Sequence, residues 1–406
     1  MRSGTSIRWV VDLACLATLC ALAGCALISG RQVHTTAPAA EVAPAPPPKP
    51  QYAAPIDTHT FTLNPDDDVV GTVQLTIASK EDTLSDIARR FNVGYEEIVR
   101  ANPGVDPWLP GAGRSIVVPT RFVLPDAPRE GIIINVAAMR LYYFPPHKKG
   151  EPQVVFTYPI GIGKVGWSTP MGTTKIATHK KDPVWHPSVA LRKDHFNDSG
   201  EELAAVVPAG PDNPLGKYEM TLGWPSYLIH GTNKPYGIGL RSSHGCMRLY
   251  PEDIEKLFYM VPDGMSVRVV NQPFLFGRQD NQLYLQAYTV LEDDSRDWKR
   301  AQQKLLSRSL PVNIRQSLKA GGDQIDWDSV AAITHEPRGV PVPVTGSGNS
   351  IDAVLATAPT VENRIPDGAD WDGSDATDEN GNSAKPLLLE REPATAQTPA
   401  PYAPGG

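Results

Sequence analysis

The chain has little cysteine and no excess of basic residues, and both shortages narrow what it can be. Only four cysteines occur in 406 residues. Cys15 and Cys20 fall inside an apolar N-terminal segment and need no disulfide explanation, which leaves Cys25 and Cys246. Lysine and arginine total 38 against 45 aspartates and glutamates, a net charge of −7. Without a basic surplus, nucleic acid is not an expected partner.

Long hydrophobic runs are also scarce. The N-terminal run from Leu13 to Ala23 is too short to span a bilayer and is typical of a signal peptide, here residues 1–24. It ends in Leu22-Ala23-Gly24-Cys25, which resembles a bacterial lipobox. The resemblance implies a lipid on Cys25 and a periplasm-facing protein; an ordinary secretory signal is the alternative. Because Ala26 follows, similarity to enterobacterial sorting signals favours the outer membrane.

Proline and glycine are abundant, at 40 and 34 residues, but unevenly placed. Residues 25–70 are predicted to be a lipidated N-terminus and a Pro/Ala-rich linker around Pro46-Pro47-Pro48, which favours extended polyproline II. Residues 341–406 hold ten acidic and three basic residues, so they carry the whole net charge. This composition predicts a disordered acidic tail, because it buries too little apolar surface.

Residues 71–120 have the pattern strand, helix, helix, strand. Residues 73–77 alternate apolar and polar side chains, as a half-buried strand does. Asp82 or Thr83 can cap a helix whose apolar face follows helical spacing. A second short helix is expected near residues 95–101, and residues 115–119 form a closing strand.

This segment resembles a LysM domain. The motifs that carry the resemblance are Asp82-Thr83-Leu84-Ser85-Asp86-Ile87-Ala88, Phe91-Asn92-Val93, Ala101-Asn102-Pro103-Gly104 and Ile116-Val117-Val118-Pro119. It implies binding to the glycan strands of peptidoglycan, in a groove between the first strand–helix loop and the second helix–strand loop. A LysM fold that only packs against its neighbour is the alternative.

Residues 130–273 are predicted to form a mainly β domain of short strands separated by glycine and proline. One helix is expected from Pro251 to Met260, because Pro251 suits its first turn and the acidic residues after it suit the helix dipole. Residues 274–340 are predicted to be a helix-containing extension.

The chemistry concentrates around one thiol. Cys246 ends the run Ser243-His244-Gly245-Cys246, and His230 lies upstream. A thiol needs a neighbouring base to become a nucleophile, and an imidazole can supply it. Glycine before the nucleophile lets backbone N–H groups face a developing oxyanion. A buried inert cysteine and a core histidine are the separate alternatives, and both weaken when the groups occur together.

These residues are similar to the L,D-transpeptidase family, in its YkuD-domain, ErfK/YbiS/YcfS/YnhG branch, whose motif is His, a spacer, then Ser/Thr-His-Gly-Cys. Many members have asparagine two residues past the cysteine, where this chain has Arg248. Further matches are Gly166-Trp167-Ser168-Thr169-Pro170-Met171-Gly172, Asp182-Pro183-Val184-Trp185-His186-Pro187, Asn213-Pro214-Leu215-Gly216 and His230-Gly231-Thr232.

The resemblance implies a β-sandwich or barrel-like catalytic domain and a cysteine acyl transfer. Cys246 would be the nucleophile and His230 the base, oriented by the carbonyl of Gly231. His244, Gly245 and Cys246 would shape the site and its oxyanion hole, with Ser243 among the substrate or oxyanion residues. Arg248 would contact a substrate carboxylate or hold the loop. A resting imidazolium–thiolate pair is expected.

The acyl donor would be a peptidoglycan tetrapeptide stem cut between residue 3 and the terminal D-Ala. The acceptor amine would come from a second stem, giving a 3→3 cross-link, or from a Braun-type lipoprotein. Water or another D-amino acid would instead give an L,D-carboxypeptidase or an exchange enzyme, and a dead peptidoglycan-binding lipoprotein is the non-enzyme alternative. No cofactor and no metal are expected, because His179, His186 and His195 lack paired close spacing.

Overall fold

The computed structural model describes residues 52–322, 324–369 and 371. The predicted signal peptide, the lipidation site Cys25 and most of the predicted linker lie outside the described residues. A nine-stranded mixed sheet forms the centre of the catalytic domain. In spatial order its strands are β1 (Thr60–Leu63), β8 (Gln153–Pro159), β7 (Arg140–Phe144), β6 (Gly131–Asn135), β15 (Ser266–Val270), β10 (Gly172–Lys181), β11 (Tyr218–Leu222), β12 (Leu228–His230) and β14 (Met247–Arg248).

Both faces of this sheet are covered at β6 and β7, which explains their continuous apolar sequence. Ile132 and Ile134 pack into the main core with α4 (Pro251–Met260) through Ile254 and Leu257. Ile133 faces the other way, into a smaller core with Phe122. The helix predicted from Pro251 to Met260 is confirmed at the same bounds, with Pro251 in its first turn.

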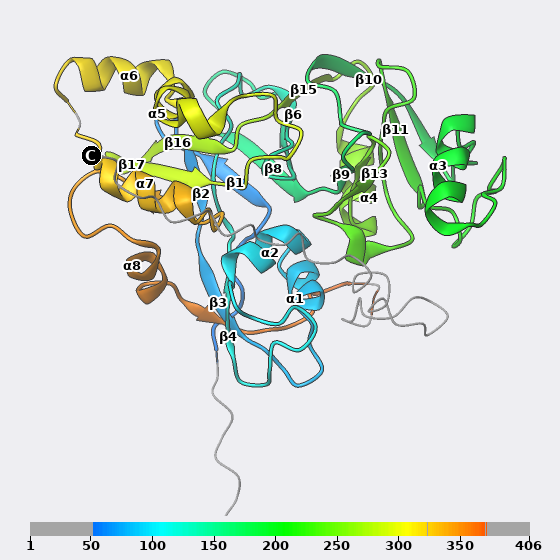
Figure 1. Ribbon diagram of the computed structural model, residues 1–406, viewed down its shortest axis with the longest axis horizontal. Coiled ribbons are helices and arrows are strands. Elements are labelled where there is room, and N and C mark those ends of the chain that lie inside the picture. Colours follow the sequence, from blue (N-terminus) through cyan, green and yellow to red (C-terminus); the bar gives the residue numbers. More distant parts are fainter. Residues whose placement is uncertain (1–51, 323, 370, 372–406) are drawn as a thin grey trace, which may run out of the picture. The chain divides into compact units, whose positions relative to one another are not determined.

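Three short elements beside the sheet frame the thiol loop. β9 (Ile162–Gly163) and β13 (Arg241–Ser243) form a parallel pair, and the turn η1 (Pro235–Gly237) precedes β13. Helix α3 (Val189–Ser199) lies in the long connection between β10 and β11, at the right of Figure 1. None of its residues is buried.

The strand–helix–helix–strand pattern predicted for residues 71–120 is confirmed. It consists of β3 (Gln74–Ile77), α1 (Leu84–Arg90), α2 (Tyr95–Ala101) and β4 (Ser115–Val118), with β3 and β4 antiparallel. Thr83 is the N-cap of α1, and it forms a reciprocal capping box with Asp86. Leu84, Ile87 and Phe91 fill the small core, as the helical spacing predicts.

The predicted linker ends earlier than residue 70. Residues 60–63 form β1, which pairs with β8, and β2 (Val69–Gly71) pairs with β5 (Arg121–Val123). Leu63 and Val70 are buried against Phe122. The prediction was wrong here because these strands are only four and three residues long and their partners lie far along the chain.

The extension after the catalytic domain has its own core. Its sheet consists of β16 (Phe274–Gln279), β17 (Gln282–Ala287) and β18 (Val342–Pro343), and its helices are α5 (Trp298–Ser309), α6 (Val312–Lys319) and α7 (Trp327–His335). Leu306 of α5 and Leu310, which directly follows α5, pack in one core with this sheet. Figure 1 shows these elements in yellow and orange, beside the catalytic sheet. No described helix is long and apolar enough to cross a membrane.

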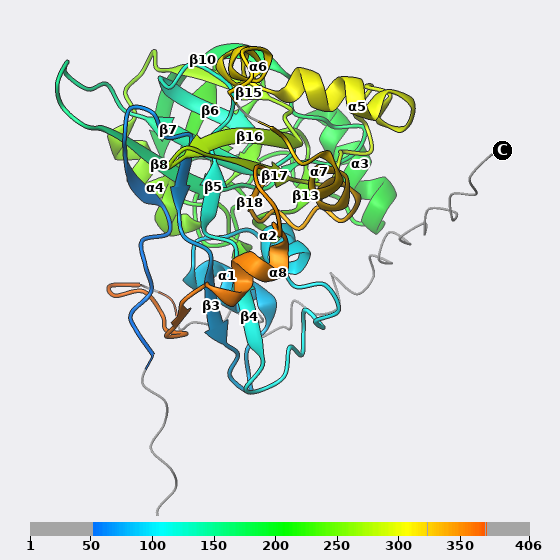
Figure 2. The ribbon, with the colours of Figure 1, turned by 90° about the vertical axis from the view of Figure 1, so that its left-hand side faces the viewer.

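The predicted disorder from residue 341 onward is wrong for the part of the tail that the structure describes. β18 completes the extension's sheet, α8 (Ile351–Ala356) follows, and β19 (Thr360–Val361) pairs in parallel with β3. Both ribbon views place α8 and the orange segment that follows it near β3 and β4 (Figures 1 and 2). The acidic composition of residues 341–406 as a whole does not report the valines at its start, which include the fully buried Val361. Residues 372–406 lie outside the described residues.

Candidate active site

Strand pairing brings His230 and Arg248 together. Across β11, β12 and β14, Glu219 pairs with His230, and His230 pairs with Arg248. The adjacent set of paired residues on the same three strands lies in the main core and consists of Met220, Ile229 and Met247. Since side chains alternate along strands, Glu219, His230 and Arg248 share the opposite face.

Cys246 lies directly before β14, two residues from Arg248, and therefore borders this polar row. It is a free thiol among the described residues and is partly exposed. Its Sγ lies 3.7 Å from the carbonyl oxygen of Ser226. The thiol is thus accessible to a ligand, and its present hydrogen-bond contact is with the backbone.

Hydroxyl groups fix the loop that carries the thiol. The Ser243 hydroxyl donates to the Cys246 carbonyl at 2.6 Å and accepts from the Gly245 N–H at 3.2 Å. Thr169 Oγ1 donates to the Gly245 carbonyl at 3.0 Å. No protein acceptor within the described chain receives the Cys246 N–H, so this group is available to an oxyanion.

Gly245 must be glycine. Its φ is +102°, a conformation that side-chain-bearing residues rarely adopt. An added Cβ would lie 2.7 Å from Cε1 of Tyr227. The residue before the thiol is therefore fixed by both backbone conformation and the aromatic ring beside it.

His230 is neutral in the resting site. The residue is buried, at 4% exposure, and burial, with help from the charge of Arg248, lowers its pKa to about 3. Backbone hydrogen-bonding groups of Gly231 and Leu215 oppose this shift. A neutral imidazole is the form that can accept a proton from a thiol.

The thiol is also held in its neutral form. Burial raises the pKa of Cys246, and Glu219 raises it further, while the Leu228 backbone and Arg248 lower it. Both pKa shifts disfavour the resting imidazolium–thiolate pair that the sequence predicted. The sequence prediction considered the attraction between the two groups, whereas burial adds a free-energy cost for both charges.

His244 has a partner of its own. Its Nε2 lies 2.6 Å from Oδ2 of Asp194 on α3, and the same carboxylate lies 2.7 Å from Nζ of Lys164. The indole of Trp167 packs edge-on against the imidazole, with ring centroids 4.8 Å apart. Burial lowers the pKa of His244, although Asp194 opposes this. These contacts connect the thiol loop to helix α3.

Comparison with known proteins agrees with this geometry. Residues 129–269 match the L,D-transpeptidase catalytic domain (YkuD) model, and residues 79–119 match the LysM domain model. The chain is 37% identical over 273 residues to "Probable L,D-transpeptidase YcfS" of Escherichia coli, covering 64% of this chain and 80% of that protein. It is 39% identical over 264 residues to "Probable L,D-transpeptidase ErfK/SrfK" of Salmonella typhimurium, covering 64% and 82%.

The chain belongs to the L,D-transpeptidase family. It is a mainly β cysteine acyltransferase that acts on peptidoglycan, and it carries a LysM domain. "Probable L,D-transpeptidase YbiS" of Escherichia coli is also similar, at 39% identity over 249 residues, covering 61% of this chain and 78% of that protein.

Two side chains of this L,D-transpeptidase site were not identified from the sequence. Glu219 interrupts the apolar strand β11 and is 8% exposed, and burial raises its pKa. A charged residue inside an otherwise apolar strand was the available signal. Asp194 lies about 50 residues before His244 on a helix with no buried residue, so nothing in its local pattern pointed to the thiol loop.

The three histidines considered for zinc have separate surroundings. His179 Nδ1 is 2.6 Å from Oδ1 of Asp263. His186 precedes α3, and His195 lies within it. Within the described ranges, no group of three or more His, Cys, Asp or Glu side chains is arranged to hold a metal ion.

Proposed function

We propose that Cys246 is the nucleophile of this L,D-transpeptidase and that His230 is its general base. The observation that carries the proposal is the β12–β14 pairing, which puts His230 and Arg248 on one face beside the thiol. His230 is the better base of the two histidines because Nε2 of His244 is already bound to Asp194. We assign His244 the role of positioning the thiol loop.

The first half-reaction follows from the neutral resting pair. His230 accepts the thiol proton as the sulfur attacks the carbonyl carbon between stem residue 3 and the terminal D-Ala. The tetrahedral intermediate then collapses, and the imidazolium returns the proton to the nitrogen of the departing D-Ala. A thioester on Cys246 is left, and the charge of Arg248 favours the transient thiolate.

The second half-reaction reverses these proton transfers. An amine of the acceptor attacks the thioester carbon, His230 takes its proton, and that proton returns to the sulfur when the C–S bond breaks. The product is a new amide, either a 3→3 cross-link or an attachment to a Braun-type lipoprotein. Hydrolysis or exchange with a free D-amino acid would use the same groups.

We assign the backbone N–H of Cys246 as the hydrogen-bond donor to the oxyanion. The Gly245 N–H already donates to Ser243, whereas that of Cys246 is free of protein acceptors in the described chain. We assign Arg248 to a substrate carboxylate or to holding the loop, where its Nη1 lies 3.2 Å from the Ser242 hydroxyl. The free N–H and the guanidinium together give the site a donor for the transition state and a cation for the substrate.

We also propose that the enzyme works in the cell envelope, facing the periplasm, and is anchored by a lipid on Cys25. The lipobox-like run Leu22-Ala23-Gly24-Cys25 supports this anchor. A lipid-anchored, periplasm-facing position would bring the thiol site to its polymeric substrate. Mass spectrometry of the protein purified from membranes tests the anchor, because Cys25→Ala would abolish the lipid adduct.

The direct test of the activity is digestion of purified sacculi, followed by mass spectrometry of the muropeptides. Wild-type protein is expected to release D-Ala and to form cross-linked dimers or lipoprotein adducts, and Cys246→Ala is expected to do neither. Free tripeptides without dimers would assign the hydrolytic alternative. Product formation by Cys246→Ala would overturn the assignment of the nucleophile.

A further inference from the structure

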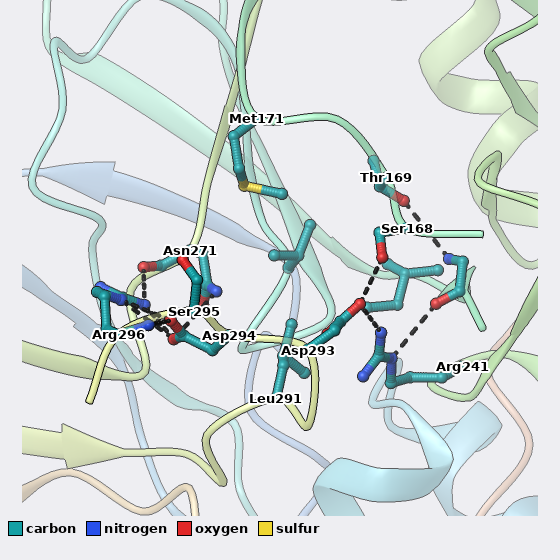
Figure 3. A pocket seen from close by; sticks show the side chains of 13 residues that line it. Ser168, Thr169, Met171, Arg241, Asn271, Leu291, Asp293, Asp294, Ser295 and Arg296 are labelled. Atoms are coloured by element: carbon teal, nitrogen blue, oxygen red, sulfur yellow. Dashed lines mark hydrogen bonds and ion pairs between the residues drawn. The ribbon is translucent and has the colours of Figure 1, made fainter. Parts of the chain in front are cut away.

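The C-terminal extension is connected both to the catalytic domain and to the LysM domain. On the catalytic side, Asp293 binds Ser168 and Arg241 beside β9, as Figure 3 shows. On the LysM side, the chain leaves the extension's sheet after β18, forms α8 and then pairs β19 with β3. The residues that match the LysM domain model end at residue 119, so β19 is a strand that this chain adds to the domain from outside the matched region.

Hydrogen bonds and core packing hold β19 against β3. The Leu75 N–H donates to the Pro359 carbonyl at 2.8 Å, and the Thr76 hydroxyl donates to the Val361 carbonyl at 3.0 Å. The Val361 side chain is fully buried in the small core that α1 also fills. Because the pairing of β19 with β3 is parallel, the residues after Val361 run alongside the end of β3 in a defined position.

Asn363 brings its side-chain amide to the first groove loop, residues 78–83, which lies between β3 and α1. Its Nδ2 donates to the Ile77 carbonyl at 3.0 Å and to Oδ2 of Asp82 at 2.7 Å. Its Oδ1 accepts from Nη1 of Arg90 at 3.0 Å. The amide therefore joins the residue before the loop, a residue near its end and the helix that follows it.

Asp82 is the point where the bonds of this loop meet. Its Oδ2 also accepts the Ser79 N–H at 2.6 Å, and its Oδ1 binds Nη1 of Arg90 at 2.6 Å. The Asp82 and Arg90 side chains are 4% and 12% exposed. Residues 79–81, between these anchors, are exposed. The first groove loop thus has a fixed base and a tip that a glycan can reach.

The first groove loop also contacts the second one, residues 102–114. The Ala78 N–H donates to the Arg114 carbonyl, and the Gly113 N–H donates to the Ala78 carbonyl, both at 2.9 Å. A displacement of the first loop would therefore change the groove that the two loops form. A groove that is ordered before its ligand arrives binds more tightly, because the ligand does not have to supply the free energy of ordering the loop.

We propose that Asn363 is a positioning residue for the glycan site of the LysM domain, where it holds the first groove loop in the conformation that binds a peptidoglycan strand. The proposal rests on the proposed function, because it takes peptidoglycan as the substrate. It adds a residue of the C-terminal segment to the machinery that binds this substrate. It also gives the extension a role, since the chain of the extension leads into the segment that completes the glycan-binding domain.

The contacts require an amide at position 363. An asparagine can donate to Asp82 and accept from Arg90 with the same side chain. An aspartate has nearly the same shape but no side-chain N–H, so it would place a second carboxylate against Asp82. An alanine would remove these hydrogen bonds without adding a charge. The two substitutions therefore separate the loss of the bonds from repulsion in the loop.

The binding test uses the full chain with Cys246→Ala, so that sacculi are bound but not processed. Pull-down by purified sacculi is compared among this parent, Asn363→Ala, Asn363→Asp and the control Glu362→Gln. Glu362 is the neighbouring residue, its side chain is 55% exposed, and it pairs with Arg364 in the same segment. Urea unfolding of each variant shows whether it is folded under the conditions of the pull-down.

Asn363→Ala is expected to weaken sacculus binding by roughly 3- to 10-fold, and Asn363→Asp by more, while Glu362→Gln binds like the parent. In enzyme that retains Cys246, the sacculus concentration that gives half-maximal turnover should rise by the same factor. Turnover of a soluble tetrapeptide should be unchanged, because this substrate carries no glycan. A residue with only a structural role would not change binding by a protein that remains folded.

Two results would overturn the proposal. One is sacculus binding by both Asn363 variants that equals that of Glu362→Gln, and the other is an equal loss of turnover on sacculi and on the soluble tetrapeptide. Failure of the parent to bind sacculi would overturn the glycan site itself. Failure of wild type to process either substrate would instead overturn the proposed function.

Discussion

Arg140 of the catalytic strand β7 forms a bidentate ion pair with Glu97 of the LysM helix α2. Nε and Nη2 donate to the two carboxylate oxygens, both at 2.7 Å, and the side chains are 0% and 4% exposed. Nη1 also donates to the Thr157 hydroxyl at 3.2 Å, and Nη2 to the Asn92 carbonyl at 3.1 Å. A buried ion pair thus connects the LysM domain to the catalytic sheet.

Glu97→Gln is expected to destabilise the folded protein by about 3–5 kcal/mol, because it leaves Arg140 buried without a counter-charge. Urea unfolding measures this loss in the free energy of unfolding. Glu81→Gln is the control in the same domain, since Glu81 is 87% exposed in its pair with Lys80, and it should leave stability unchanged. Equal stability of Glu97→Gln and wild type would show that the pair does not fasten the domains.

This pair also changes how glycan binding can be tested. Deleting residues 72–120 would leave the buried Arg140 without its partner Glu97, so reduced activity after deletion would not report on binding alone. Point substitutions in the two groove loops, residues 78–83 and 102–114, avoid the problem. The second loop contacts the start of α1, directly after the first loop, because the Leu84 N–H donates to the Pro107 carbonyl at 2.8 Å.

Leu109→Asp is expected to weaken sacculus pull-down of the Cys246→Ala protein several-fold. Leu109 is 66% exposed in the second groove loop, where a charge would oppose contact with a glycan face. Val312→Asp is the matched control, since Val312 is 58% exposed but lies in the extension. If both variants bind sacculi like the parent, the domain packs against its neighbour without presenting a glycan groove in these loops.

The local sequence predicted the parts of the site that lie close together in the chain. The Ser243–Cys246 run and His230 are separated by 13 residues, and two adjacent strands suffice to bring them together. The LysM elements were predicted for the same reason, because helical spacing and a Thr83 cap are local signals.

The parts that could not be predicted depend on contacts between distant segments. Asp293 reaches Ser168 across 125 residues, and β19 pairs with β3 across about 285 residues. The protonation states of His230 and Cys246 could not be predicted for a related reason. The His230 and Cys246 pKa values are set by burial, which no motif reports.

The neutral resting pair predicts that Cys246 contributes no thiolate absorbance at neutral pH. Ultraviolet titration of wild type minus Cys246→Ala should show the thiolate appearing only above its ordinary pKa of about 8.5, because burial raises the pKa of the thiol. Wild-type acylation should also lack a step near pH 6.5, since the pKa of His230 is lowered to about 3. A thiolate signal at neutral pH would restore the ion-pair interpretation.

His230→Ala should slow β-lactam acylation strongly at neutral pH, because no base then accepts the thiol proton. Raising the pH to about 10 should restore part of the acylation, as the thiol ionises by itself. Transpeptidation should not recover, because the leaving amine still lacks its acid. Near-wild-type acylation by His230→Ala at neutral pH would mean that His244 is the working base.

Asp194→Asn should lower turnover, up to roughly 100-fold, because it weakens the hydrogen bond that positions His244. Asp198→Asn is the matched control. It removes a carboxylate 2.7 Å from the same Lys164 on the same helix, but this carboxylate has no contact with His244. Steady-state kinetics on a soluble tetrapeptide compares the two. Equal effects of both substitutions would assign the role to the lysine contact and not to His244.

Asp253 makes the stability of the protein depend on pH. It is fully buried in the first turn of α4, Asn92 Nδ2 binds its Oδ1 at 2.7 Å, and its Oδ2 has no partner within the described chain. Burial raises its pKa to about 7, and Glu252 adds to the shift, while Lys256, Asn92 and Arg140 oppose it. The folded state therefore favours the protonated acid more than the unfolded state does.

The sign of the effect follows from this shift. The stability due to Asp253 is complete below its unfolded pKa of about 4, is lost as the pH rises towards about 7, and changes no further above that. The side chain of Asp253→Asn cannot ionise. The free energy of unfolding of this variant should therefore match that of wild type at about pH 4 and exceed it by about 2–4 kcal/mol at about pH 8. Urea unfolding across this range measures the difference, with the exposed Glu130→Gln as a control that should follow wild type. A constant difference between Asp253→Asn and wild type over the whole range would show that Asp253 does not titrate between the two states.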